Sequence, residues 1–231
     1  MSLRFSIIIT ILSLAIFGFT LKKNKLSDPD KEKVLLEIVK YVVERGHYNS
    51  IELDDDFSVK IFDDFISKLD PQKRFFTGSD IRQLNRFKYK IDDQIKNYQL
   101  EFFEETYKTY NQRVSDAKLF VDKVFETDFD FSEDEFIDLN NDSIPFSFGK
   151  NQLFERWRKQ IKYSVLDIVT QRYNSDSLDF NEIKTNAIST VKKNTNDFFE
   201  YANELDRDDW FSVFVNSFVS QFDPHTFYFK P

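Results

Sequence analysis

The stretch Phe103–Val124, FEETYKTYNQRVSDAKLFVDKV, decides the fold class of this chain. Apolar side chains recur in it at alternating steps of four and three residues, a heptad pattern typical of a long helix packed against other helices. The seam consists of Phe103, Tyr107, Tyr110, Val114, Ala117, Val121 and Val124. We expect its partners within the same chain, because intermolecular coiled coils usually sustain more heptads.

Helical spacing extends toward the N-terminus from this stretch. Residues 79–144 contain neither Pro nor Gly. Ser79 is the expected N-cap of a first long helix with a break near Lys96–Gln99, so two long central helices are predicted. Earlier helices are predicted at 28–46, with Asp28 as N-cap, and at 55–69. Their apolar faces are Leu35, Ile38, Val39 and Val42 in the first, and Phe62, Phe65, Ile66 and Leu69 in the second.

Toward the C-terminus, Ser132 with Glu135 predicts a capping box and a short helix. Residues 140–149 are an expected loop and 174–177 an expected turn. Three further apolar faces are lined by Phe154, Trp157, Ile161, Val165 and Ile168, by Ile183, Ala187, Val191 and Phe198, and by Phe211, Phe214, Phe218 and Phe222. No alternating pattern indicates a strand, so the expected class is all-α with about seven helices.

Composition excludes several kinds of site. The net charge of −8 argues against binding to nucleic acid, and the absence of Cys excludes disulfides, Cys-ligated zinc and a thiol nucleophile. His47 and His225 are far apart in sequence, and the acidic clusters lack the spacing of a calcium loop. We therefore predict no metal, no cofactor and no catalytic residue.

Residues 1–26 differ from the rest of the chain. Arg4 precedes an apolar run from Phe5 to Leu21, and Lys22 and Lys23 follow it. This pattern indicates either a cleaved signal peptide or an uncleaved N-terminal membrane anchor, and both would export residues 27–231. Contact with a membrane is expected only through this segment.

Two later segments repeat one pattern. Phe65-Ile-Ser-Lys-Leu-Asp-Pro71 and Phe218-Val-Ser-Gln-Phe-Asp-Pro224 are each followed by aromatic residues. A residue before proline is disfavoured in the α region, so the two helices are expected to end near Asp70 and Asp223. The aromatic residues beyond each stop can fold back onto the helix end.

These segments also carry a family resemblance. The chain resembles the N-terminal domain of tail-specific (carboxy-terminal processing) proteases over residues 28–231. Single motifs are weak, but their order and spacing together are fairly specific. The motifs are Leu69-Asp70-Pro71, Arg74-Phe75-Phe76, Ser79-Asp80-Ile81, Trp157-Arg158-Lys159 and Phe222-Asp223-Pro224-His225-Thr226, followed by Tyr228 and Pro231.

The resemblance implies a role in an exported serine endopeptidase of the periplasm or cell envelope, anchored in the inner membrane if residues 1–26 are kept. Such enzymes recognise C-terminal tails of envelope proteins through a PDZ domain and cleave with a Ser nucleophile and a Lys base, without a metal. The helical region is implied to be a scaffold that docks substrates or an adaptor protein.

This sequence departs from that family pattern at Pro231, where the PDZ domain would begin. With only 4 Gly residues, it offers no Gly-rich segment for a PDZ carboxylate loop or an oxyanion hole. We expect no peptidase activity from the chain alone. Its expected partners are the PDZ and protease domains of the same polypeptide, and protein substrates or an envelope adaptor. The alternative is a free-standing helical scaffold or adaptor, which should bury Phe227, Tyr228 and Phe229.

Overall fold

The computed structural model describes residues 28–46, 51–141, 143–173 and 179–230. The predicted signal or anchor segment 1–26 and the predicted turn 174–177 lie outside these ranges. Contacts divide the chain into two units, 1–32 and 33–231. Only the start of a helix is described in the first unit, and the packing described below is that of the second.

The described residues form helices and no strand, which confirms the all-α class. No helix among them has both the length and the apolar character needed to cross a membrane. The α-helices are α2 (Asp28–Gly46), α3 (Asp55–Leu69), α4 (Gly78–Leu84), α5 (Ile91–Lys96), α6 (Glu101–Phe125), α7 (Lys150–Tyr173), α8 (Phe180–Glu204) and α9 (Arg207–Val219), and a 3-10 turn, η1, covers Asn85–Phe87.

Side-chain caps fix where several helices begin. Asp54 accepts the N–H of Phe57 at 2.8 Å at the start of α3, and Asp206 forms a capping box with Asp209 at the start of α9. At α4 the cap is Thr77, which exchanges bonds with Asp80. The prediction of Ser79 as N-cap was wrong by two residues, because Asp80 at the third helical position pairs with Thr77.

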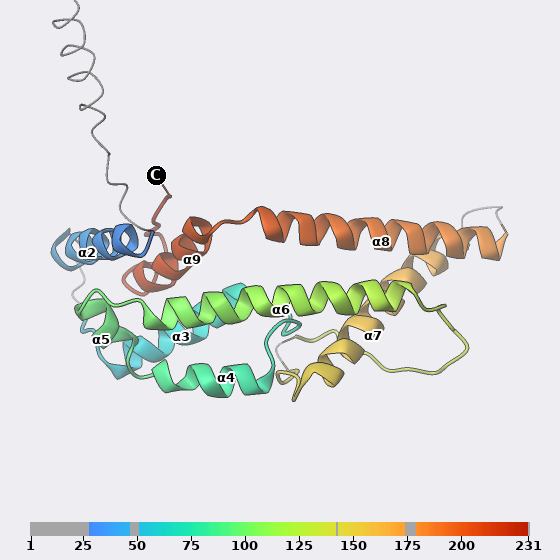
Figure 1. The fold of residues 1–231 in the computed structure, drawn as a ribbon, viewed down its shortest axis with the longest axis horizontal. Helices are drawn as coiled ribbons and strands as arrows, with labels where there is room; N and C mark the ends of the chain where they lie inside the picture. Colours follow the sequence, from blue (N-terminus) through green and yellow to red (C-terminus); the bar gives the residue numbers. More distant parts are fainter. Residues whose placement is uncertain (1–27, 47–50, 142, 174–178, 231) are drawn as a thin grey trace, which may run out of the picture. The chain divides into compact units, whose positions relative to one another are not determined.

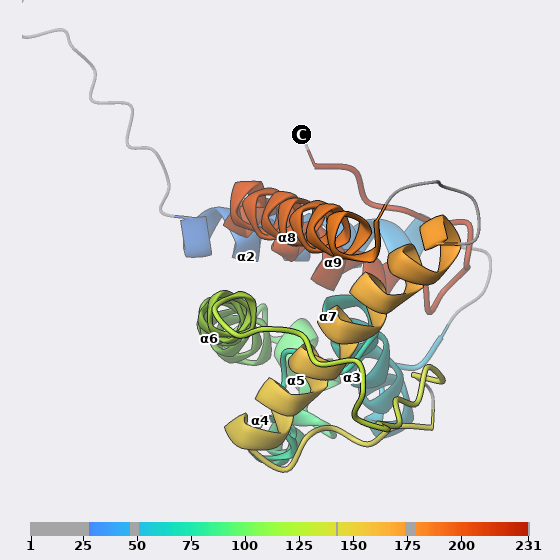
Figure 2. The same cartoon turned by 90° about the vertical axis from the view of Figure 1, so that its right-hand side faces the viewer.

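Helix α6 is the element that the others share. It packs against α4 on one side and α8 on another, while α7 crosses and contacts both α6 and α8 (Figure 1). Near the N-terminal end of α6, helix α9 packs on α3, and α3 also contacts α5. Figure 2 shows α7 running obliquely between α8 and the α4 region. The heptad seam is therefore covered by helices of the same chain.

The seam prediction is confirmed by burial. Six of its seven side chains are buried, and Tyr107 is half-buried against the same core. At the N-terminal end of α6, Phe65, Phe103 and Phe214 bring α3, α6 and α9 together, with ring centroids 5.4–6.3 Å apart. Edge and tilted contacts of this kind add to the free energy gained by burying the rings.

The first predicted long helix is broken. The chain turns after η1, and the N–H of Ile91 donates to the Ser58 hydroxyl at 2.7 Å instead of continuing a helix. The break after α5 has a positive φ of 56° at Tyr98, and the Gln94 side chain accepts the N–H of Phe102 at 3.0 Å. Tertiary bonds of this kind override helical periodicity, so the long helices are α6, α7 and α8.

The apolar face predicted for α2 is only partly correct. Leu36 and Val43 are buried, and Leu35 and Val39 are half-buried. Ile38 and Val42, by contrast, are 53% and 57% exposed. The helix carries two adjacent apolar stripes, and its packing uses the one through Leu36 and Val43, which the prediction did not include.

Candidate functional site

The turn that follows α3 is organised by one carboxylate. Asp70 is buried at the C-cap of α3, where its Oδ1 accepts the N–H of Arg74 at 2.8 Å. Its Oδ2 accepts the N–H groups of Phe75 and Phe76 at 3.0 and 2.8 Å. Both oxygens are thus used to fold the chain back, which places the two Phe rings in the core and confirms the predicted helix stop.

The electrostatics of this turn are set by burial. Burial raises the pKa of Asp70, and the three N–H donors and the charge of Arg74 act in the opposite direction. Burial also lowers the pKa of Arg74 from its usual value, and Asp70 opposes that change. The two charged groups make no direct hydrogen bond or ion pair, but as neighbours of opposite charge each lessens the cost of desolvating the other.

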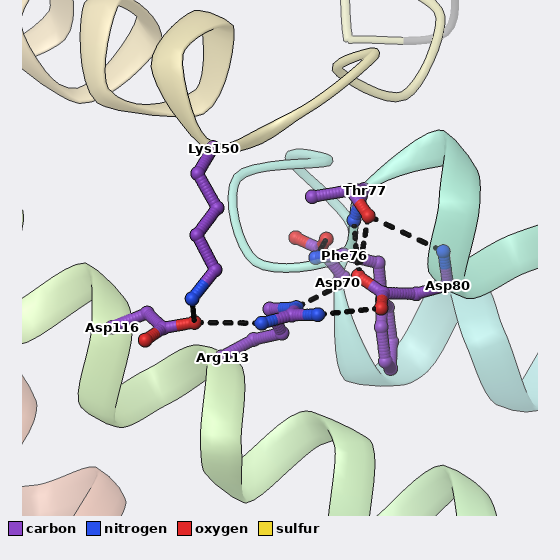
Figure 3. Close-up of polar contacts among 7 residues, drawn as sticks. All are labelled: Asp70, Phe76, Thr77, Asp80, Arg113, Asp116 and Lys150. Atoms are coloured by element: carbon purple, nitrogen blue, oxygen red, sulfur yellow. Dashed lines mark hydrogen bonds and ion pairs between the residues drawn. The ribbon is translucent and has the colours of Figure 1, made fainter.

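A polar network ties the N-terminus of α4 to α6 and α7 (Figure 3). The Arg113 guanidinium donates to both oxygens of Asp80 at 2.8 Å and to Asp116 at 2.7 Å. Lys150, at the start of α7, lies 2.9 Å from the same Asp116 oxygen, and the Thr77 hydroxyl donates to Asp80 at 2.6 Å. Arg113 thus bridges two carboxylates in fixed, partly bidentate geometry.

The pKa values of both carboxylates follow from these contacts. Burial raises the pKa of Asp80, but the hydrogen bonds from Arg113 and Thr77 outweigh it and the pKa is lowered. Burial likewise raises the pKa of Asp116, and Lys150 and Arg113 together lower it. Both groups are therefore charged near neutral pH, and their ion pairs with Arg113 and Lys150 hold α4, α6 and α7 together. The network presents no unpaired nucleophile or base.

The long connection from α6 to α7 is held at several points, of which two concern the predictions made from the sequence. Gly78 donates its N–H to the carbonyl of Ser147 at 2.7 Å, beside an isolated bridge between Thr77 and Ser147. Farther back, Glu135 pairs with Arg158 and with Lys162, the latter at 2.5 Å. The prediction of a Ser132–Glu135 capping box was wrong, because α7 recruits the Glu135 carboxylate and no helix forms there.

The C-terminal segment is held against α9. The Asn216 side chain accepts the N–H of Tyr228 at 2.7 Å and donates to its carbonyl at 3.0 Å. Lys230 lies 2.9 Å from a carboxylate oxygen of Asp206. Phe229, between these two attachments, is 85% exposed, and Phe227, just before the first of them, is 60% exposed.

The two similar turns therefore differ in what they do with their aromatic residues. The helix stop at Asp223 is confirmed, since α9 ends at Val219 and a turn follows. Asp223, however, accepts the N–H of His225 at 2.8 Å and leaves the aromatic residues beyond it at the surface. The expectation that they fold back holds for Phe75 and Phe76, but of the second set only Tyr228 is half-buried.

The other motif residues are structural contacts. The Trp157 ring N–H donates to the carbonyl of Arg74 at 2.8 Å, and Arg158 pairs with Glu135. His225 lies in an exposed turn, while His47 is outside the described ranges. Within the part of the chain that the structure describes, no three His, Asp or Glu side chains group in a way that could hold a metal ion.

Three residues with important contacts in the structure were not singled out from the sequence: Arg113 and Asp116 of the polar network, and Asn216, which holds Tyr228. All three lie on helices, and in the sequence Arg113 and Asp116 look like solvated charges between seam positions. No sequence signal distinguished them, because their partners come from other parts of the chain. The helix positions of Thr77 and Asp80, by contrast, could have identified the capping box.

Comparison with known families adds to this geometry. Residues 38–231 match the family described as the tail-specific protease N-terminal domain. The chain belongs to this family. The match takes in the Asp70 turn, the Arg113 network and the C-terminal segment, so each is a feature of a tail-specific protease N-terminal domain as this sequence builds it.

One longer relative shows how much of a tail-specific protease this chain corresponds to. The chain is 26% identical over 217 residues to the tail-specific protease of Haemophilus influenzae. The similarity covers 92% of this chain and 30% of that protein. The chain thus spans less than a third of the length of the relative it matches.

Proposed function

We propose that this chain is the non-catalytic helical region of an exported carboxy-terminal processing endopeptidase. In this proposal it is a scaffold that docks the PDZ and protease domains of the same polypeptide, together with protein substrates or an envelope adaptor. Cleavage by a Ser–Lys pair belongs to those other domains, so the chain alone is inactive. The observation that carries the proposal is the exposed aromatic pair Phe227 and Phe229, on a segment that Asn216 holds at Tyr228 and Asp206 holds at Lys230.

The exposure of this pair is energetically unfavourable unless a neighbour covers it. Burying one Phe side chain contributes about 1.5–3 kcal/mol of favourable free energy, so covering both rings would contribute roughly twice that amount. The bonds of Asn216 to Tyr228 and of Lys230 to Asp206 fix the segment that carries them. A fixed apolar pair suits a docking surface, because little further ordering is needed when the partner binds.

The longer relative supports a partner within the same polypeptide. The chain corresponds to 30% of that protein, which leaves ample sequence for domains that could cover the pair. Export to the cell envelope is part of the proposal and has two supports. The first is the apolar run Phe5–Leu21 behind Arg4, and the second is the membership of the chain in the tail-specific protease family.

The first test is the size of the native product. An antibody against residues 27–231 would be used on the cell-envelope fraction of the source organism. A band well above 27.7 kDa is expected, since the proposal requires PDZ and protease domains in the same polypeptide. A band at or below that mass would exclude these partners and favour a free-standing scaffold.

A second test addresses catalysis directly. The purified chain is incubated with a test protein that ends in an apolar C-terminal tail, and cleavage is followed by mass spectrometry. No cleavage is expected. Cleavage that a single Ser substitution in this chain abolishes would overturn the non-catalytic assignment.

A further inference from the structure

A groove runs between α7 and α8 and reaches the turn that follows α3. Its volume is about 370 Å³, and Trp157 and Ile161 of α7 and Val191 and Phe198 of α8 contribute to its lining. Arg74, from the turn after α3, lines the end formed by Trp157 and Phe198. The groove thus combines apolar walls with one guanidinium group.

The Arg74 guanidinium is held between two aromatic rings. Its central carbon lies 4.7 Å from the Trp157 ring centroid and 4.6 Å from that of Phe198, a sandwich that fixes its position. Both oxygens of the neighbouring Asp70 are already occupied by main-chain N–H groups. Among the residues that the structure describes, the guanidinium itself makes no hydrogen bond or ion pair.

Other half-buried arginines use their donors, while Arg45 and Arg82, which also make no hydrogen bond or ion pair among the described residues, are exposed. Arg113 and Arg158 each pair with two carboxylates, and Arg156 donates to the carbonyls of Lys73 and Pro145. A guanidinium has five N–H donors whose planar arrangement matches a carboxylate. Arg74 is half-buried, positioned and unpaired, so its donors are available to a ligand in the groove.

We propose that this groove binds a polypeptide segment through an Asp or Glu side chain, whose carboxylate pairs with Arg74. An apolar neighbour of that side chain would pack on Ile161 and Val191. Charge complementarity carries the choice of ligand. A singly charged carboxylate fits better than a phosphate, because Asp167 also lines the groove and repels a higher charge.

The recessed position of Arg74 favours a side chain over a chain terminus. A Glu carboxylate projects several bonds from its main chain, so it can reach between Trp157 and Phe198 while the backbone stays at the rim. A terminal carboxylate would have to bring its own main chain into that space. This inference does not depend on the proposed protease role.

The test uses Trp157 as a built-in reporter. In the full chain carrying Trp210→Phe, Trp157 is the remaining tryptophan, and this change removes an indole N–H that has no hydrogen-bond partner in the structure. Three peptides with blocked N-termini are titrated against its fluorescence. They are Leu-Leu-Glu-Leu-Leu amide, the same peptide with Gln in place of Glu, and Leu-Leu-Leu-Leu with a free C-terminal carboxylate.

The Glu peptide is expected to bind at least about tenfold more tightly than the Gln peptide, which corresponds to losing one charge-assisted bidentate pair. Arg74→Gln should remove that difference. Equal binding of the Glu and Gln peptides, or no binding of either, would overturn the proposal. Tighter binding of the peptide with the free C-terminus would also overturn it, in favour of a terminal carboxylate.

Two substitutions at the groove keep the test valid if Arg74→Gln does not fold. Asn194 is exposed on α8, and among the described contacts the Asp167 carboxylate bonds only the Gln171 side chain, one turn along α7. Asn194→Asp should weaken binding of the Glu peptide several-fold, and Asp167→Asn should strengthen it, with the Gln peptide unaffected. If neither change alters binding of the Glu peptide, the groove is not the site.

Discussion

The Asn216 side chain holds the main chain of Tyr228 from both sides, accepting its N–H at 2.7 Å and donating to its carbonyl at 3.0 Å. One side-chain amide thus satisfies both main-chain hydrogen-bonding groups of Tyr228, as a neighbouring strand would in a sheet. The bond is local to the C-terminal end, and its removal should act there without unfolding the helices.

Asn216→Ala should therefore release the segment around Tyr228. Leaving two main-chain groups without partners costs about 1–3 kcal/mol, so the protection of the Tyr228 amide against hydrogen exchange should fall by tenfold or more. Gln221→Ala, which removes a side-chain bond to the Ser217 carbonyl nearby, is the matched control and should leave Tyr228 protected. Unchanged exchange at Tyr228 in Asn216→Ala would contradict the two-sided clamp.

Removal of Arg113 should destabilise the whole domain. Arg113→Met leaves Asp80 without its charged partner and Asp116 with Lys150 alone, and breaking a largely buried pair costs about 3 kcal/mol or more. Urea denaturation measures this change. The control is Arg86→Met, whose exposed pair with Glu105 should contribute less than about 1 kcal/mol. Equal losses in the two variants would mean that the Arg113 network adds little to stability.

Acid should loosen the part of the connection around Glu135 before the core unfolds. Hydrogen bonds from Arg158 and Lys162 lower the pKa of Glu135 to about 2, below its unfolded value near 4.5. The stabilising contribution of a group with a lowered pKa is complete above the unfolded value and is lost as the pH falls toward the folded one. Hydrogen exchange around Glu135 should therefore increase between about pH 4.5 and 2.

The variant Glu135→Gln separates this effect from general acid unfolding. It should show faster exchange in the connection already at pH 7, and little further change between pH 4.5 and 2. High salt should weaken the effect in the unmodified chain, since this pair is near the surface. A connection that exchanges equally fast in both proteins at pH 7 would rule out the Glu135 anchor.

The exposed aromatic pair should be dispensable for folding. Phe227→Ser with Phe229→Ser should change the free energy of unfolding by no more than about 0.5 kcal/mol per site, as for other surface positions. Tyr228→Ser, at a half-buried position between them, should cost more. Light scattering should also show less self-association in the double variant, because it lacks the apolar surface. A large loss of stability in the double variant would indicate that the rings are packed.

Elements governed by local rules could be predicted from the sequence. The α6 seam follows from heptad spacing, and the ends of α3 and α9 follow from the constraint that Pro71 and Pro224 place on the preceding residues. The capping box of α4 was within reach of the same rules, because Thr77 and Asp80 have the spacing of such a box. In each of these cases the deciding atoms lie within a few residues of one another.

Features that depend on distant partners could not be predicted. Arg113 pairs with Asp80, 33 residues away, and Glu135 pairs with Lys162, 27 residues away, instead of forming the predicted local cap. The face that α2 buries was likewise undetermined, because two neighbouring apolar stripes are equally compatible with a helix. The Arg74 groove needs α7, α8 and the turn after α3 together, and no local pattern places these three side by side.

The packing of α3 against α9 has a consequence for the chain while it is being synthesised. Lys68 and Ser217 meet although they are 149 residues apart, and the Phe-rich face of α3 is completed only when α9 arrives. At synthesis rates of roughly 5–20 residues per second, that face waits about 7–30 s for its partner. The nascent chain therefore has an early aggregation-prone interval, during which a chaperone that shields the first apolar helices would protect it.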